Sequence, residues 1–254
     1  MTVLARGWLL ALIVSGLIGE HVAAQPRLDG LTPYRATYAL FEQDKRVGQS
    51  SFTLSYDSAS RRYTFESRSR FRGLLRLAVP QPVVERSEFV MTGDAIRPIA
   101  FAYEDGTRQG KRNIALSFDW DSRMMTVSRR EGVSKVPIEP ATLDRGSVRV
   151  ALMRDLERGQ RTGTHILADP DVVRAYDYAI ESTEEIVTAL GEITAHKIRQ
   201  QRDGSSRHTL IWAAPNLDFV MLRMEQHRED RDTIAFVIES IEWLGGGDTP
   251  DRGD

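Results

Sequence analysis

The chain contains no cysteine among its 254 residues. This absence excludes disulfide bonds, thiolate zinc sites, iron–sulfur clusters, a cysteine nucleophile and an acylated N-terminal cysteine. The chain also lacks an excess of charge of one sign, because 34 basic residues face 36 acidic ones. A nearly neutral chain has no global basic field, so we expect no nucleic-acid partner.

The near-neutral total hides an uneven distribution of charge. Residues 61–86 hold seven arginines and two glutamates, whereas residues 225–254 hold nine acidic residues and three arginines. With 41% hydrophobic and 28% charged residues, the composition is that of a folded, water-soluble protein. It is not typical of a disordered chain or of a bundle of membrane helices.

The first 24 residues have the pattern of a secretory signal peptide. Arg6 supplies a positive charge, and residues 7–18 form an apolar run that is shorter than the roughly 20 residues needed to cross a bilayer. Small side chains follow and predict cleavage between Ala24 and Gln25. We therefore expect an exported, periplasmic and soluble protein, with no lipid anchor and no membrane span in the mature chain.

Most of the remaining chain alternates apolar and polar residues, the period of a half-buried β-strand. Residues 34–56 predict a hairpin around the turn residues 44–48. We expect one domain over residues 25–244, followed by a flexible tail over residues 245–254. In the last strand the apolar residues change face near Glu239, which predicts a β-bulge. Further strands are predicted around residues 63–65 and at residues 83–91, 96–104, 112–120, 123–130, 172–187, 192–202, 207–213, 219–227 and 233–244.

One segment has helical periodicity, which predicts an amphipathic helix over residues 147–158. Asp144 and Ser147 are suited to cap its N-terminus, and Gly159 stands where a glycine commonly ends a helix. The predicted apolar face consists of Val148, Ala151, Leu152 and Leu156. The predicted solvent face carries Arg149, Arg154, Asp155 and Glu157.

Several short motifs follow one another in an order that resembles a known family. A Y-x-A-x-Y strand begins at Tyr34, and a W-A-A-P turn begins at Trp212. Over residues 34–244 the chain resembles the exported bacterial family called domain of unknown function 3108. One position departs from the family pattern, because Leu217-Asp218-Phe219 replaces a leucine-proline-valine step. The other matching features are Gly48, Phe118-Asp119-Trp120, Leu143-Asp144, Ser147, Leu152 to Leu156 and Ala189-Leu190-Gly191.

The resemblance implies a fold more than an activity. The family is similar to the periplasmic half-barrel carriers that ferry lipoproteins to the outer membrane. In those carriers an incomplete antiparallel barrel curls around a helix and leaves an apolar cavity. The residues independently favour a mainly β fold of the α+β class: a curved antiparallel sheet, or half-barrel, wrapped around one central amphipathic helix.

From this fold we expect a non-enzymatic binding protein of the cell envelope. It would hold a lipid or an acylated polypeptide in the concave face of the sheet, by removing apolar surface from water. The alternative is an envelope protein-interaction module whose interior is filled by its own side chains. A cavity of about 300 Å³ or more that is lined by Leu152, Trp120 and Trp212 would favour the carrier, and a packed interior would favour the module. The candidate ligand-lining residues are Tyr38, Phe118, Trp120, Leu152, Leu156 and Trp212.

The sequence predicts no catalytic residues, no metal site and no cofactor. It contains no G-x-S-x-G motif, and a hydrolase whose site only the fold assembles is the least favoured alternative. The histidines that follow the predicted signal peptide stand on different predicted elements, without the spacing of metal ligands. They are His165, His196, His208 and His227.

The segment Ser69–Pro82 interleaves arginines with apolar residues. As a loop or a short amphipathic element it would touch an anionic membrane surface, with apolar side chains inserted and arginines on the phosphates. The alternative is an ordinary sheet segment with Phe71 and the leucines in the core. The candidate contact residues are Arg70, Arg72, Leu74, Leu75 and Arg76.

Overall fold

The structure is a computed structural model that describes residues 31–229 and 231–245. The predicted signal peptide, its cleavage between Ala24 and Gln25, and all of the predicted tail except its first residue lie outside these residues. Within the described part, no helix has the length and apolar character needed to cross a membrane.

The described chain is mainly β. The strands before the longer helix are β1 (Tyr34–Glu42), β2 (Lys45–Asp57), β3 (Arg62–Phe71), β4 (Val83–Thr92), β5 (Ala95–Glu104), β6 (Ile114–Asp119), β7 (Met124–Arg129), β8 (Gly132–Pro137) and β9 (Thr142–Leu143). The strands after it are β10 (Thr162–Asp169), β11 (Val172–Thr188), β12 (Gly191–Gln201), β13 (His208–Ala214), β14 (Val220–Arg228) and β15 (Arg231–Trp243). The helical elements are α1 (Leu75–Ala78), α2 (Ser147–Glu157) and the single 3₁₀ turn η1 (Pro215–Leu217).

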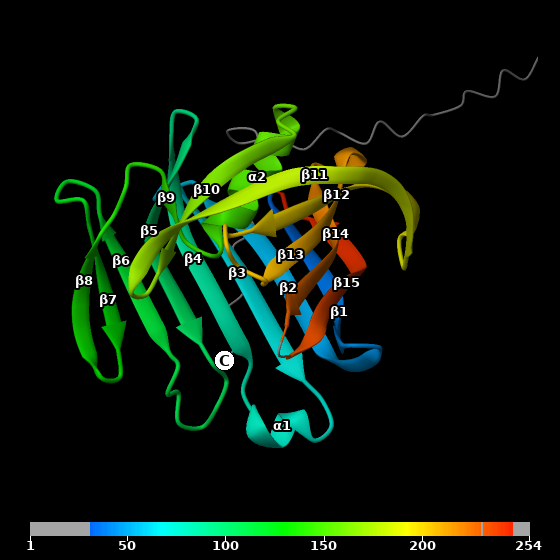
Figure 1. The fold of residues 1–254 in the computed structure, drawn as a ribbon, viewed down its shortest axis with the longest axis horizontal. Coiled ribbons are helices and arrows are strands. Elements are labelled where there is room, and N and C mark those ends of the chain that lie inside the picture. Colours follow the sequence, from blue (N-terminus) through cyan, green and yellow to red (C-terminus); the bar gives the residue numbers. More distant parts are fainter. Residues whose placement is uncertain (1–30, 230, 246–254) are drawn as a thin grey trace, which may run out of the picture.

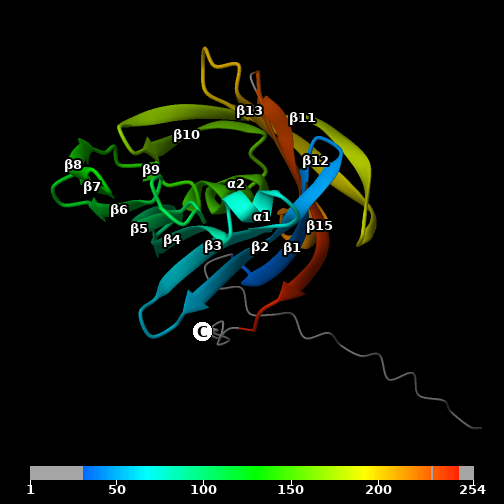
Figure 2. The same ribbon diagram turned by 90° about the horizontal axis from the view of Figure 1, so that it is seen from below.

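All of these strands join one sheet, in the order β8-β7-β6-β5-β4-β3-β2-β1-β15-β14-β13-β12-β11-β10-β9. The first arm runs outward from β1 to the edge strand β8, and the second arm returns from the edge strand β9 to β15. The two arms meet where β1 pairs with β15, so the first and last strands lie side by side. The sheet is strongly curved and is not closed (Figures 1 and 2).

The expectation of a wholly antiparallel sheet is wrong at one edge. There β9 and β10 are parallel, with Thr142 opposite Ile166 and Leu143 opposite Leu167. Two parallel neighbours need a long crossover connection, usually a helix. The connection here contains α2, which links the edge strand β9 to its neighbour β10 on the same arm.

The strand predictions are largely confirmed, but β8, β9 and β10 were not predicted. In β8 nearly every residue is exposed, because this strand forms an edge, and its sequence therefore lacks the alternation of a half-buried strand. The predicted bulge is confirmed: Thr37 pairs with Ser240 and Tyr38 with Ile238, which leaves Glu239 as the extra residue.

Gly48 is required by the close approach of β2 and β3. A Cβ atom at this position would lie 2.3 Å from the backbone oxygen of Arg70. We expect Gly48→Ala to lower the free energy of unfolding by about 1–3 kcal/mol, because the two strands must separate locally. Urea denaturation checks this. Gly245→Ala is the matched control, since nothing lies within 4 Å of a Cβ there. Equal stability of the two variants would contradict the prediction.

The side chains of the sheet and of α2 form two cores. The first core, at the junction of the two arms, combines α2 with residues of both arms, including Phe52, Phe65 and Phe89 on the first arm and Ile198 and Leu222 on the second. The second core lies between the outer strands of the first arm and the start of the second arm, where Ala168 packs against Phe101, Leu116, Met125 and Val127. Figures 1 and 2 show α2 between β10 and β11 on one side and β3 and β4 on the other.

The helix α2 occupies the predicted residues, but it is enclosed on more sides than its sequence predicts. Val150 is fully buried, and Arg154, predicted on the solvent face, is only 8% exposed. Ala151, predicted on the apolar face, is half-buried. A simple division into a core face and a solvent face is therefore not confirmed. The physical reason is that both arms of the sheet pack against the helix.

Candidate functional site

The six predicted ligand-lining residues do not converge on one cavity. Tyr38, Leu152, Leu156 and Trp212 are buried in the first core. Phe118 and Trp120 belong instead to the second core, where their rings stack with centroids 6.1 Å apart. The six residues are therefore packed against protein side chains in two separate places.

Two hollows are present on the first arm, and neither contains a predicted ligand-lining residue. They have volumes of about 280 and 580 Å³ and lie over β4 to β7. The smaller is lined mainly by side chains that alternate with the buried Ser87, Phe101 and Leu116, and therefore point away from the core. Its outward-pointing lining includes Arg86, Glu88, Ala100, Ala102, Ala115 and Ser117.

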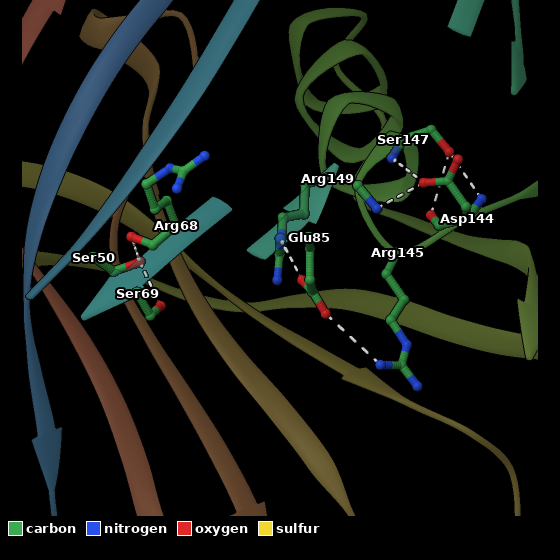
Figure 3. Close-up of polar contacts among 9 residues, drawn as sticks. Ser50, Arg68, Ser69, Glu85, Asp144, Arg145, Ser147 and Arg149 are labelled. Atoms are coloured by element: carbon green, nitrogen blue, oxygen red, sulfur yellow. Dashed lines mark hydrogen bonds and ion pairs between the residues drawn. The ribbon is translucent and has the colours of Figure 1, made fainter. Parts of the chain in front are cut away.

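A charged cluster lies where α2 meets the inner face of the sheet (Figure 3). Arg145 and Arg149 approach the two carboxylate oxygens of Glu85 on β4, with N–O distances of 3.7 and 3.3 Å. The guanidinium of Arg149 also lies 5.0 Å from the ring centroid of Phe52. Because two arginines share one carboxylate, this Glu85 cluster has a surplus positive charge. The side chain of Arg145 is 45% exposed, so an anionic group can reach it.

Asp144 fastens the start of α2 to the sheet (Figure 3). One carboxylate oxygen accepts hydrogen bonds from the backbone N–H groups of Gly146 and Ser147, at 2.8 and 2.9 Å. The other accepts a hydrogen bond from the hydroxyl of Ser87 on β4, at 2.8 Å. The N-cap residue is Gly146, so neither Asp144 nor Ser147 occupies the predicted capping position, although Asp144 still satisfies two backbone N–H groups at this helix end. Ser147 is the first helical residue, and its hydroxyl accepts a hydrogen bond from the Asp144 N–H.

The burial of Asp144 changes its acidity. The carboxyl group has no contact with solvent, and this loss of hydration raises its pKa to about 6, although the hydrogen bonds from Ser147, Ser87 and Gly146 act in the opposite direction. The structure therefore places a titrating group at the junction between α2 and β4.

Two buried serines form a further polar contact on the same face. The hydroxyls of Ser50 and Ser69 are 2.9 Å apart, and Ser50 also donates to the backbone oxygen of Arg68 (Figure 3). An activated serine nucleophile needs a base within hydrogen-bond reach. Within residues 31–229 and 231–245, neither serine hydroxyl bonds to a histidine or a carboxylate.

His165, Asp155 and Tyr178 form a cluster that the sequence reasoning did not find, because it considered His165 alone. Asp155 on α2 lies 2.9 Å from His165 Nε2 and accepts a hydrogen bond from the Tyr178 hydroxyl at 2.8 Å. Burial opposes the charge of Asp155, but these hydrogen bonds outweigh it and hold the pKa of Asp155 below its usual value. The cluster ties α2 to β10 and β11. In the described part of the chain, no three His, Asp or Glu side chains gather as metal ligands.

The predicted membrane-contact residues lie together at one end of the sheet. Arg70 belongs to the end of β3, and α1 follows at the bottom of Figure 1. Leu74 and Leu77 are 84% and 74% exposed, and Leu75 is 37% exposed. The alternative that these leucines belong to the core is therefore wrong. These leucines lie in the loop that connects the end of β3 to the start of β4, outside the strands of the sheet.

The sequence does not reveal the Glu85 cluster, because its members lie far apart along the chain. The helical pattern predicts Arg149 on the solvent face of the helix, whereas its guanidinium covers the ring of Phe52. One sequence signal could have found the cluster. The side chains of β4 that face inward are those of Val83, Glu85, Ser87 and Phe89. Glu85 is therefore the one charged side chain in a row that is otherwise uncharged.

The chain matches the family model described as "Protein of unknown function (DUF3108)" over residues 33–233. No curated protein matches it. A solved β-barrel-like protein of domain of unknown function DUF1849 from Brucella abortus is similar, with 13% identity and a TM-score of 0.49, covering 84% of this chain and 98% of that one. A protein with a YMCC-like fold from Bacteroides fragilis has 10% identity and a TM-score of 0.30, covering 86% of this chain and 98% of that one.

Proposed function

The chain belongs to the DUF3108 family of proteins of unknown function, and on this premise we propose that it is a non-enzymatic binding module of the cell envelope that works through its outer surface. The main support for a function of the outer surface is that the interior is filled by the protein's own side chains. At the junction of the arms Tyr38, Phe52, Phe65 and Phe89 are all buried, and α2 fills the space between them and the second arm. Because these buried side chains pack together in one cluster with α2, a ligand could enter only if some of them moved.

Among the described residues, the inner serine hydroxyls bond to groups that give them a structural role, and the non-enzymatic part of the proposal is in keeping with this. Ser87 donates to the buried Asp144, and this carboxylate is occupied by two backbone N–H groups. Ser50 and Ser69 bond to each other. These bonds satisfy polar groups that would otherwise be costly to bury, which is a structural role.

The Glu85 cluster favours a second candidate, a carrier of an amphiphilic ligand. An anionic headgroup would pair with the exposed part of Arg145 near the start of α2. The apolar tail would then have to displace side chains of the first core, such as Phe52 or Phe65, which lie next to Arg149. Because this displacement has a cost in packing, the carrier ranks second.

Native mass spectrometry of protein exported to the periplasm of its own cells separates the two candidates. We expect the mass of a chain that begins at Gln25, in agreement with the predicted signal peptide, and we expect no bound lipid. A stoichiometric lipid mass that survives gentle activation would instead support the carrier. A chain that keeps residues 1–24 would contradict cleavage after Ala24 without bearing on the packed interior.

A further inference from the structure

The loop between β3 and β4 presents leucines to solvent. Six large apolar side chains of the described residues are exposed, and three of them lie in this loop: Leu74, Leu75 and Leu77. No residue of α1 is buried. Single exposed apolar residues are common on protein surfaces, but a cluster of this kind indicates a contact surface.

The loop is held in place at both ends, so the exposure belongs to a defined conformation. The Arg72 N–H donates to the backbone oxygen of Val47 at 2.9 Å, and the Gln81 N–H donates to that of Gly106 at 3.0 Å. Gly73 adopts a positive φ of 60°, which turns the chain into α1. Between these two anchors, residues 73–78 are all exposed.

The charge around the leucines has one sign. Residues 69–82 contain Arg70, Arg72 and Arg76 and no acidic residue. Within the described part of the chain, Arg70 and Arg76 form no ion pair, and the Arg72 guanidinium donates only to the backbone oxygen of Arg46. The adjoining loop, joined through Gly106, adds Arg108, Lys111 and Arg112, of which Arg112 pairs with Asp105.

The loop also lies at an end of the sheet, where a membrane surface can approach it. The register places Ser69 opposite Val83 and Val84 opposite Glu104, so the β3–β4 and β5–β6 loops leave the same end of the sheet. Figure 1 shows α1 projecting at this end of the sheet. Nothing else in the described chain covers Leu74 or Leu77.

We propose that this arginine–leucine loop, residues 70–79, docks the protein on an anionic lipid bilayer. Leu74 and Leu77 enter the boundary between headgroups and acyl chains, and Arg70, Arg72 and Arg76 bind lipid phosphates. Apolar insertion and charge attraction are both required, because either contribution alone gives weak and reversible membrane binding. This inference rests on the proposed function, in which the protein binds its partner through its outer surface.

The test is flotation of the exported protein with vesicles of phosphatidylglycerol and phosphatidylcholine. We expect the protein to bind these vesicles, to bind pure phosphatidylcholine vesicles far less, and to be released by high salt. Leu74→Ser with Leu77→Ser should lower the partition coefficient about tenfold or more, because two large apolar insertions are lost. Both leucines are exposed, so the variant should keep the fold, which far-UV and near-UV circular dichroism check.

Val133→Ser with Val187→Ser is the matched control, since these side chains are 70% and 81% exposed on other strands. It should bind as the unchanged protein does. Three results would overturn the proposal: no binding of the unchanged protein to anionic vesicles, equal binding to both kinds of vesicle, or equal losses in the leucine and valine variants. If native mass spectrometry shows no bound lipid and the protein does not float with vesicles, the proposed surface function still holds. Only the bilayer is then rejected as the partner.

Discussion

Leu152→Ala is expected to lower the free energy of unfolding by about 2–5 kcal/mol. Leu152 lies on α2 in the first core and is buried between the two arms of the sheet. Truncation removes apolar surface burial and leaves a cavity that the surrounding strands can fill only in part. Urea denaturation followed by circular dichroism measures the loss.

Leu77→Ala provides the control for this prediction, because Leu77 is also a leucine but its side chain is 74% exposed on the surface. It should change the free energy of unfolding by no more than about 0.5 kcal/mol. The comparison also tests the filled interior. If Leu152 lined an open cavity, its truncation would break few contacts, and the two variants would have similar stability. That result would favour the carrier over the surface-binding module.

The stability of the protein is expected to fall as the pH rises through the titration of Asp144. Burial raises the pKa of this carboxyl from 3.8 to about 6 in the folded state. Well below pH 3.8 the group is protonated in both states. Between about pH 4 and pH 6 the unfolded chain loses the proton while the folded chain keeps it, so folding becomes less favourable. A difference of about two pKa units corresponds to about 3 kcal/mol.

Asp144→Asn isolates this contribution from the other titrating groups. The amide oxygen can still accept from the N–H groups of Gly146 and Ser147, and the amide nitrogen can donate to the Ser87 hydroxyl. Asparagine does not titrate, so the stability of the unchanged protein relative to the variant should decrease by about 3 kcal/mol between about pH 4 and pH 7. Urea denaturation at several pH values checks this. A constant difference across that range would show that Asp144 is not a buried titrating carboxyl.

Local sequence patterns were sufficient where a segment has one buried face. The hairpin of β1 and β2, the bulge at Glu239 and the residues of α2 follow from period-two or helical spacing alone. The edge strand β8 could not be found in this way, because a strand exposed on nearly all of its residues has no alternation to detect. The parallel pairing of β9 with β10 also depends on where the crossover helix returns.

The candidate site was less accessible from the sequence than the fold. The arginine–leucine loop was recognisable, because charged and apolar residues alternate over a short contiguous segment ending in prolines. The Glu85 cluster was not, because its members lie on β4 and near α2, about 60 residues apart in the chain. The ligand-lining predictions named side chains that are apolar, without being able to separate a cavity wall from a filled core.

The sequence by itself determined that this protein has no thiol chemistry, that its chain folds mainly as β-strands with alternating apolar and polar residues, and that residues 147–157 are helical. These properties depend on residue type and on spacing between near neighbours, both of which can be read along the chain. Only the tertiary structure decided that the two arms fill their interior around α2, that Arg154 is buried and that Leu74 and Leu77 are not. Burial is decided by contacts between segments distant in the sequence, and composition alone does not contain that information.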